Sequence, residues 1–309
     1  MWKYVLKRIL YLIPCILAVS FIVYFLMSFS GDPVLSLVSD NATEEEIEMM
    51  REKMGLNRPL VVRYVEYMGN VLHGDLGRSI NGNKNVWAEY AARMPYTIWL
   101  AVVSVLILII VSLPLGILAA LKHGSWLDSI LSGFAMVTLS IPSFWAGLLM
   151  IILFAVKLGW LPVSGAETGN SVIMPAICCS LSHIALLTRT TRTSMLDQLN
   201  ADYLRTARAK GVPERKVVTR HALNNALIPI ITILGNDMSI LFAGTVAVET
   251  VFTWPGIGYL IVTSIRGNDY NMVTGCVLMT TIIVSILLLI VDILYAFVDP
   301  RIKAQYTGR

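Results

Sequence analysis

Six long apolar segments constrain what this 309-residue chain can fold into. Each is near or above the roughly 20 residues that an α-helix needs to cross the hydrocarbon core of a bilayer. The segments are Ile9–Phe29, Tyr96–Leu121, Ile130–Val156, Ser171–Thr188, Ala226–Val248 and Met272–Val298. With 56% hydrophobic and 14% charged residues, the chain carries more apolar surface than one soluble core of this size needs. The sequence therefore predicts an all-α, polytopic integral membrane protein with six transmembrane helices.

The first segment looks like a secretory signal peptide, because Lys3, Lys7 and Arg8 precede its apolar run. The run is longer, however, than the apolar region of about 7 to 15 residues in such a peptide. We therefore predict that residues 1–30 form a short tail and a first span that is retained.

The placement of lysine and arginine predicts the orientation of these spans. The N-terminal tail, the second and fourth loops and the C-terminal tail hold three, one, eight and three basic residues. The alternate loops hold seven, one and one, and the loop with seven also carries ten acids. Because basic residues are enriched on the cytoplasmic side, we expect both termini to be cytoplasmic. The net charge of +4 then reflects orientation, and no nucleic-acid partner is expected.

The first loop, residues 31–95, is too long for a simple connection and is predicted to form an extracytoplasmic helical cap. Thr43 and Glu46 have the spacing of a capping box, in which each side chain satisfies a backbone amide at the start of a helix. That helix should end near Gly55, and a second helix should open at Pro59.

The longest polar interruption in the second half, residues 202–229, predicts a helix-turn-helix elbow. Asp202 can cap a short helix with three residues on its apolar side and two arginines opposite. These five residues are Tyr203, Leu204, Ala207, Arg205 and Arg208. Gly211 can adopt the left-handed conformation that ends this helix, and Pro213 fits the first turn of a second one. The same basic composition is also typical of an amphipathic loop lying on anionic lipid.

The elbow resembles the EAAxxxG loop in the membrane subunits of ATP-binding-cassette (ABC) transporters. Ala207 and Gly211 occupy the places of the second Ala and the Gly, whereas Arg205 and Thr206 replace the Glu and the first Ala. The motif RTARAKG followed by RHALNNALIP is similar to sequences in the branch that imports dipeptides and oligopeptides. It has LN at 223–224, where many such subunits have LP.

Five further phrases resemble the same family, in its order along the chain. They are GDPV at 31–34, GLNRPL at 55–60, HGDLGRS at 73–79, ETVFTWPGIG at 249–258 and VDILYAFVDPRI at 291–302. By these phrases the chain is identified as a member of the peptide/nickel importer permease family, as the first-permease (B-type) subunit.

This resemblance implies a type I ABC importer fold, with a permease core in residues 96–309 and a cytoplasmic coupling helix in the elbow at 202–222. It implies a bacterial cytoplasmic membrane, a second permease subunit in an expected heterodimer, two cytoplasmic ATPase subunits and an extracytoplasmic substrate-binding protein. The residues that would couple to the ATPase are Asp202, Tyr203, Leu204, Arg205, Ala207, Arg208, Lys210 and Gly211. The implied cargo is a dipeptide or oligopeptide, with nickel, a metal chelate or glutathione as alternatives within the family.

No motif indicates that the chain is an enzyme. It lacks GxxxxGK[ST], the loop that cradles nucleotide phosphates, so ATP and magnesium are expected in the partner subunits and no cofactor in this chain. The four histidines are scattered, and we predict no metal site. The cysteines are expected to be small packing residues, and they are Cys15, Cys178, Cys179 and Cys276.

Polar residues inside the spans are candidates for a translocation path, because ionisable groups there are costly and usually face the bundle interior or water. Asp237, with Asn236 beside it, lies in the fifth span, and His183 lies in the fourth. No Lys or Arg occurs in the spans except near their ends, so we expect water rather than an ion pair to solvate Asp237. Internal packing is the alternative role for these residues.

Two function classes outside the family stay open. A proton-coupled secondary transporter could use Asp237 and His183 as a relay. A membrane-anchored structural or signalling protein could use the cap to bind a partner. Finally, Pro114 and Pro142 remove backbone hydrogen bonds inside the second and third spans, so we expect buried kinks at both.

Overall fold

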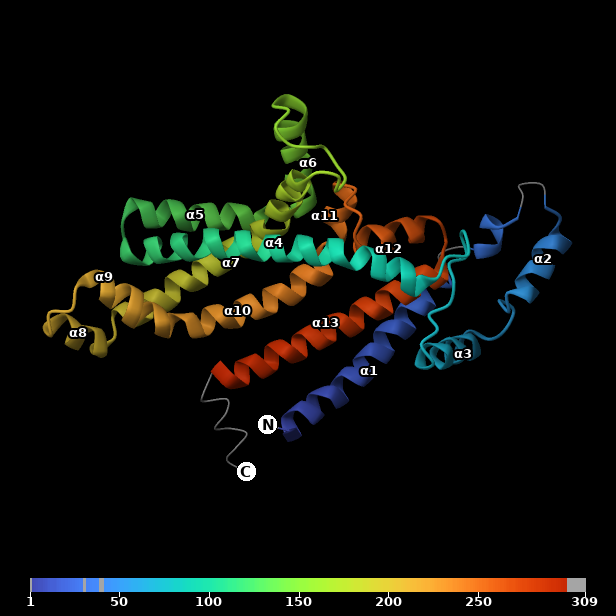
Figure 1. Ribbon diagram of the computed structural model, residues 1–309, viewed down its shortest axis with the longest axis horizontal. Helices are drawn as coiled ribbons and strands as arrows, with labels where there is room; N and C mark the ends of the chain where they lie inside the picture. Colours follow the sequence, from blue (N-terminus) through green and yellow to red (C-terminus); the bar gives the residue numbers. More distant parts are fainter. Residues whose placement is uncertain (1, 30–31, 39–41, 299–309) are drawn as a thin grey trace. The chain divides into compact units, whose positions relative to one another are not determined.

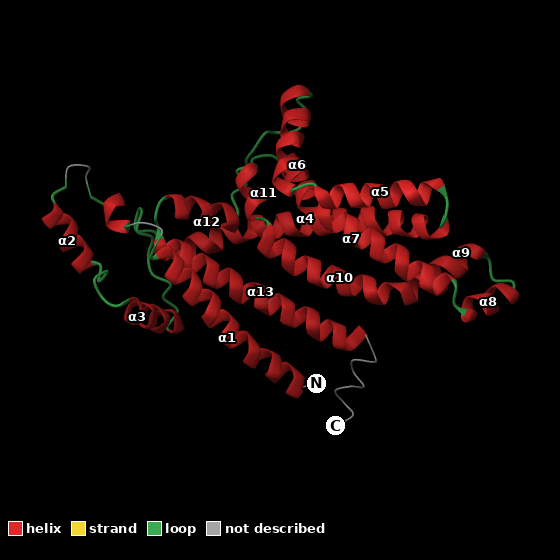
Figure 2. Cartoon of the chain, turned by 180° about the vertical axis from the view of Figure 1, so that it is seen from behind, coloured by secondary structure: helices red, strands yellow, loops and turns green. Residues whose placement is uncertain are grey.

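The structure is a computed structural model that describes residues 2–29, 32–38 and 42–298. All regular elements in these residues are helices, as Figures 1 and 2 show, which confirms the predicted all-α class. Contacts divide the chain into two compact units. Among the described residues, the core unit contains 98–254 and 290–298, and the flanking unit contains those of 2–97 and 255–289.

Parts of two quoted phrases lie outside the described residues. These parts are Gly31 of GDPV and everything after Val298, which includes the end of VDILYAFVDPRI and the C-terminal tail. The predicted division at residues 30 and 95 follows membrane spans and loops, whereas the two units follow contacts, so that division stays a prediction.

The core unit runs from within α4 to α11. Its elements are α4 (Val86–Leu121), α5 (Trp126–Ser140), α6 (Ser143–Met150), the π-helix η2 (Ile151–Lys157), the short 3₁₀-helix η3 (Gly169–Val172), α7 (Ile173–Leu199), α8 (Asp202–Ala209), α9 (Glu214–Lys216), the π-helix η4 (Val217–Ala222), α10 (Leu223–Gly244) and α11 (Val246–Val251).

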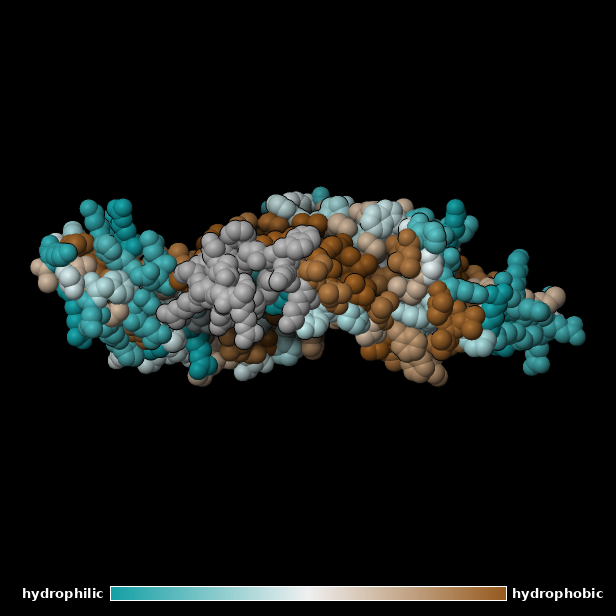
Figure 3. All heavy atoms as spheres, turned by 90° about the horizontal axis from the view of Figure 1, so that it is seen from below, coloured by the Kyte–Doolittle hydropathy of each residue, from teal (hydrophilic) through white to brown (hydrophobic). Residues whose placement is uncertain are grey.

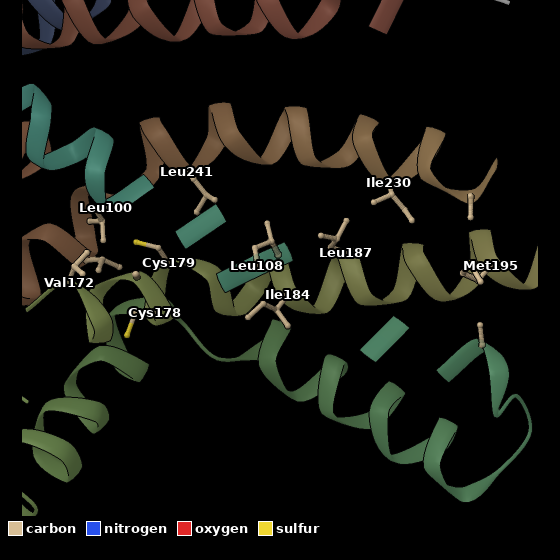
Figure 4. Packing of buried hydrophobic residues seen from close by; sticks show 14 of the residues in the cluster. Leu100, Leu108, Val172, Cys178, Cys179, Ile184, Leu187, Met195, Ile230 and Leu241 are labelled. Carbon is tan, nitrogen blue, oxygen red and sulfur yellow. The ribbon is translucent and has the colours of Figure 1, made fainter. Parts of the chain in front are cut away.

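Within the core unit, α7 is the central helix. α5, α6 and α10 all pack against it, and Figure 1 shows α4, α5, α7 and α10 side by side. Figure 4 shows Ile184 and Leu187 of α7 in one buried cluster with Leu108 of α4. The backbones of α4 and α7 approach closely at Gly116, where an added Cβ would lie 2.5 Å from the Thr191 Cβ. Glycine therefore lets α4 and α7 pack closely. Close packing matters inside a membrane because no hydrophobic driving force holds helices together there.

The third predicted span is not one straight helix, because α5 and the α6–η2 segment meet at a bend of 99°. Pro142 has no amide hydrogen to donate, and Ile141 before it is extended, with φ −90° and ψ 119°, as residues before proline prefer. The expected kink at Pro142 is therefore a complete break between two helices, whereas Pro114 lies within the continuous helix α4. The expectation that both kinks are buried was wrong, because both prolines are exposed.

Five helices in the described residues are long and apolar enough to cross a membrane, or six if the bent pair forms one span. They are Arg8–Met27, Val86–Leu121, Gly169–Leu199, Glu214–Phe242 and Tyr270–Ile293. The second helix begins at Val86 and not at Tyr96, because Asn85 Oδ1 accepts the Ala88 amide at 3.0 Å and caps an earlier start.

The flanking unit contains the start of α4 and the remaining helices, of which α13 belongs to it only up to Leu289. They are α1 (Trp2–Met27), the 3₁₀-helix η1 (Pro33–Ser36), α2 (Glu44–Lys53), α3 (Leu60–Leu72), α12 (Ile257–Arg266) and α13 (Tyr270–Val298). The predicted capping box is confirmed: Thr43 Oγ1 accepts the Glu46 amide at 3.3 Å, and Glu46 Oε2 accepts the Thr43 amide at 2.9 Å. Gly55, with φ +67°, follows α2 as predicted, and Pro59 precedes α3.

In the same unit, Asp269 fastens the loop that follows HGDLGRS to the start of α13. Its carboxylate accepts the amides of Ile80 and Met272, both at 3.1 Å, and the hydroxyl of Ser79. One acid thus caps a helix and holds a loop that is distant in the sequence.

Candidate functional site

The elbow is anchored to the core unit by the apolar side of α8. Leu204 is completely buried in the cluster formed by α4, α7 and α10, and Ala207 and Val212 pack against the same cluster. α8 is only eight residues long, which is too short to be stable alone in water. Its conformation therefore depends on this anchoring.

Tyr203 links three segments of the elbow through its hydroxyl group. The hydroxyl donates to Gln198 Oε1 of α7 at 2.8 Å and accepts from Asn225 Nδ2 of α10 at 2.9 Å. The predicted assignment of Tyr203 to the apolar side is therefore incomplete, since 40% of the residue is exposed. Its main contribution is to tie both arms of the elbow to α8.

Gly211 ends α8 in a complete Schellman motif. Its φ of +75° confirms the predicted left-handed conformation. The Val212 amide donates to the Ala207 carbonyl at 3.2 Å, and the Gly211 amide donates to the Arg208 carbonyl at 2.9 Å. No neighbouring atom lies within 4 Å of the position of an added Cβ, so conformation alone, and not space, selects glycine here.

Asp202 does not cap α8, contrary to the prediction. The N-cap is Ala201, which makes no side-chain capping bond, and Asp202 is the first helical residue. A carboxylate in the first turn still favours the helix, because it lies near the positive end of the helix dipole. The Asp202 Oδ1 atom also lies 3.5 Å from Arg205 Nη1.

The two arginines of α8 have different surroundings. Arg208 Nη2 and Nε donate to the two oxygens of Glu214, at 2.8 and 3.1 Å, which closes the turn between α8 and α9. The Glu214 carboxylate, by this hydrogen bond, raises the pKa of Arg208. Arg205 and Lys210 project outward, and Figure 3 shows hydrophilic side chains gathered over the elbow at the left of that view. A docking partner would meet Arg205 and Lys210 more readily than Arg208.

The predicted path residues are only partly brought together. His183 Nδ1 of α7 lies 2.9 Å from Asp237 Oδ1 of α10, and the Asp237 side chain is 3% exposed. The expectation that only water would solvate Asp237 is therefore incomplete, because His183 lies within hydrogen-bond distance of one of its carboxyl oxygens. The other carboxylate oxygen, Oδ2, is buried without a hydrogen-bond partner among the described residues. Asn236 is exposed and does not join the pair.

A second polar cluster was not predicted. Asp128 in the first turn of α5 accepts Arg192 Nε and Nη2 of α7 at 2.6 and 2.7 Å, and the Gly124 amide at 3.1 Å. His123 Nδ1 lies 3.2 Å from the same carboxylate. One part of this cluster could have been found in the sequence. Ser125 lies three residues before Asp128, and this capping pattern places the acid in the first turn of a helix.

The cysteines and histidines form no metal site among the described residues. Cys178, Cys179 and Cys276 are buried and Cys15 is exposed, and all four are free thiols. In their buried positions the first three act as small apolar packing residues.

Comparisons with known proteins agree with this architecture. The N-terminal model of binding-protein-dependent transport system membrane components matches residues 1–101, and the inner membrane component of such systems matches residues 112–304. The glutathione transport system permease protein GsiC of Escherichia coli K12 is 38% identical over 304 residues, which cover 98% of this chain and 99% of that protein. The oligopeptide transport system permease protein AppB of Bacillus subtilis 168 is 39% identical over 315 residues, covering 98% and 100%.

Solved structures show the same fold at lower identity. A chain of the MetNI methionine ABC transporter in an inward-facing conformation has a TM-score of 0.58 at 18% identity, over 68% of this chain and 96% of that one. An amino acid ABC transporter crystallised with histidines has a TM-score of 0.51 at 13% identity, over 69% and 94%. The fold is thus that of a membrane subunit of an ABC importer, and the chain belongs to the family of inner membrane components of binding-protein-dependent transport systems.

Proposed function

We propose that this chain is one of two membrane subunits of an ATP-driven importer whose cargo is a short peptide. Two relatives that match nearly the full chain are named for glutathione and for oligopeptides, and glutathione is itself a tripeptide. The shared cargo class is therefore a peptide, with nickel or a metal chelate as the alternative from the wider family.

The observation that carries the proposal is the geometry of the elbow. α8 is fixed on its inner side by Leu204 and on its flank by Tyr203, while Arg205 and Lys210 remain exposed. A short helix held in this way can transmit a movement of a docked protein to α7 and α10, which it joins. We assign the docked protein as one of two ATPase subunits, which would bind ATP and magnesium.

The remaining parts of the assembly follow from the same proposal. A second permease subunit would complete the pathway, and a substrate-binding protein would deliver the peptide on the extracytoplasmic side. The distribution of basic residues supports cytoplasmic termini and a cytoplasmic elbow in a bacterial inner membrane. The chain itself would perform no covalent chemistry.

Asp237, Asn236 and His183 are our candidates for the translocation path. A buried ionisable pair between two membrane helices is costly and typically marks a functional position. In the present conformation the pair is closed between α7 and α10. A translocation path at this pair would require α7 and α10 to separate. Separation would expose the Asp237 side chain, which would then favour a cargo with a free amino group.

Uptake into proteoliposomes tests the proposal. The full complex, with its binding protein outside, is expected to accumulate a labelled tripeptide only when ATP is enclosed with the ATPase domains. Unlabelled di- and tripeptides should compete, whereas nickel should not. Uptake driven by a proton gradient without ATP would contradict the importer mechanism, and competition by nickel alone would contradict the cargo class.

A further inference from the structure

A groove of about 290 Å³ lies within the core unit between α5 and α7, with α4 at its base. The α5 wall is apolar except for Ser132, and its other residues are Leu131, Ala135, Met136 and Leu139. The α7 wall carries Thr188, Arg189 and Arg192. One wall is therefore apolar and the other polar and cationic.

The polar groups are concentrated toward one end of the groove. Arg192 contacts Asp128 in the first turn of α5, so the C-terminal part of α7 lies beside the start of α5. Ala185, which also lines the groove, is seven residues before Arg192, or about 10 Å along the helix. The lining of the groove thus changes along its length from apolar to cationic. A molecule that fills the groove should have an apolar part and an anionic part.

The cationic end carries an excess of positive charge. Asp128 neutralises Arg192 through two hydrogen bonds. Arg189, which is exposed, has no acid within ion-pair distance among the residues that the structure describes. Thr188 is 6% exposed, and its hydroxyl is buried without a hydrogen-bond partner in the same part of the chain. An exposed guanidinium and an unsatisfied hydroxyl therefore line the same groove.

The exposed aromatic at the start of α5 places this end at the membrane surface. Trp126, the first residue of α5, is 75% exposed, and tryptophan is enriched where hydrocarbon meets headgroups. Farther along α5, the exposed side chains are apolar, among them Phe134 and Val137 at 53% and 58%. The groove accordingly opens on a face suited to lipid, with its cationic end at headgroup level.

We propose that this groove binds one anionic phospholipid. The phosphate accepts hydrogen bonds from the exposed Arg189 and from the Thr188 hydroxyl once that side chain rotates out of its buried position, and an acyl chain lies along Leu131, Ala135 and Leu139. Guanidinium groups suit phosphate oxygens because their donors are fixed in a plane. Since the lipid would bridge α5 and α7, it would reinforce the Asp128–Arg192 link close to the elbow.

The test uses the full-length chain, with its co-purifying subunits, in nanodiscs of phosphatidylcholine with phosphatidylglycerol as a minor component. Native mass spectrometry after mild detergent extraction gives the ratio of the two lipids retained. We expect wild type to retain phosphatidylglycerol selectively and Arg189→Gln to retain it about tenfold less, as loss of one charge-assisted hydrogen bond predicts. Lys122→Gln, which removes an exposed cation near the start of α5 but outside the groove, should leave the ratio unchanged.

A second variant separates the groove from simple charge. Ser132→Phe fills the groove and keeps both arginines, so it should also lower retention. Added inorganic phosphate should not displace the lipid, because it lacks the acyl chain. Equal retention by Arg189→Gln and Lys122→Gln would overturn the proposal, as would full displacement by phosphate or cross-linking of Ser132→Cys to a protein subunit instead of a lipid.

Discussion

Asp237 is a carboxylate that the protein encloses almost completely, with His183 as the partner of one oxygen only. Burial of a charge costs several kcal/mol unless hydrogen bonds or an opposite charge compensate it. The histidine therefore matters more to folding than the acid does. Removal of the His183 side chain leaves both buried carboxyl oxygens of Asp237 without a described partner, whereas Asp237→Asn keeps a hydrogen bond to the imidazole.

We expect His183→Ala to lower the free energy of unfolding by about 3 kcal/mol, in the range for breaking a buried pair. Asp237→Asn should cost about 1 kcal/mol, since an amide can still bond to the imidazole. Thermal unfolding of the purified chain measures both, and His73→Ala, at an exposed histidine, is the matched control. If His183→Ala and Asp237→Asn lower the free energy of unfolding equally, the histidine does not matter more to folding than the acid.

If Asp237→Asn also alters the preference among acidic, neutral and cationic peptides in uptake, the residue belongs to the translocation path.

The residue-scale features that sequence could predict are those set by neighbours along one helix. The 3.6-residue period placed Leu204 and Ala207 on one face, and the absence of a side chain marked Gly211 as a helix end. The pairs His183–Asp237 and Asp128–Arg192 join residues 54 and 64 positions apart. Such contacts depend on how helices rotate and pack, which composition and spacing do not determine.

At the scale of elements, the elbow depends on the Schellman turn after α8. A β-branched residue with φ near +75° is strained, whereas asparagine tolerates this region. We predict that Gly211→Val leaves membrane insertion intact but uncouples ATP hydrolysis from uptake, and that Gly211→Asn is close to wild type. Because the site around Gly211 is open, a defect in the valine variant reflects backbone conformation and not crowding. Normal coupling in Gly211→Val would remove the elbow from the mechanism.

Element boundaries were predicted where a cap or a proline marks them. The capping box at Thr43 and Glu46 located the start of α2 correctly. Pro142 was predicted only as a kink within one span, and it instead separates α5 from α6. The 99° angle of that bend and the two π-helical segments η2 and η4 were not predicted. Both arise from packing and from the exact register of backbone hydrogen bonds, for which apolar periodicity carries no signal.

For the whole molecule, the apolar segments and the distribution of basic residues predicted the number and the orientation of the spans. The structure confirms five helices of spanning length, with a bent pair as the sixth candidate. The orientation of the spans across the membrane remains a prediction. Charge asymmetry acts while the helices insert, and the packing of the helices does not show which side is cytoplasmic. The proposed mechanism requires that the elbow is cytoplasmic and docks against an ATPase subunit.

Cysteine cross-linking tests both the location of the elbow and its docking. In a background with Cys15→Ser, which removes the exposed native thiol, Lys210→Cys on the elbow is compared with Lys84→Cys in the first loop. We predict that a bifunctional thiol reagent links Lys210→Cys to an ATPase subunit in intact membranes, and that only Lys84→Cys reacts with an impermeant label added from outside. Labelling of Lys210→Cys from outside, or its failure to link to the ATPase while Lys84→Cys does so, would show that the elbow is not a cytoplasmic docking helix.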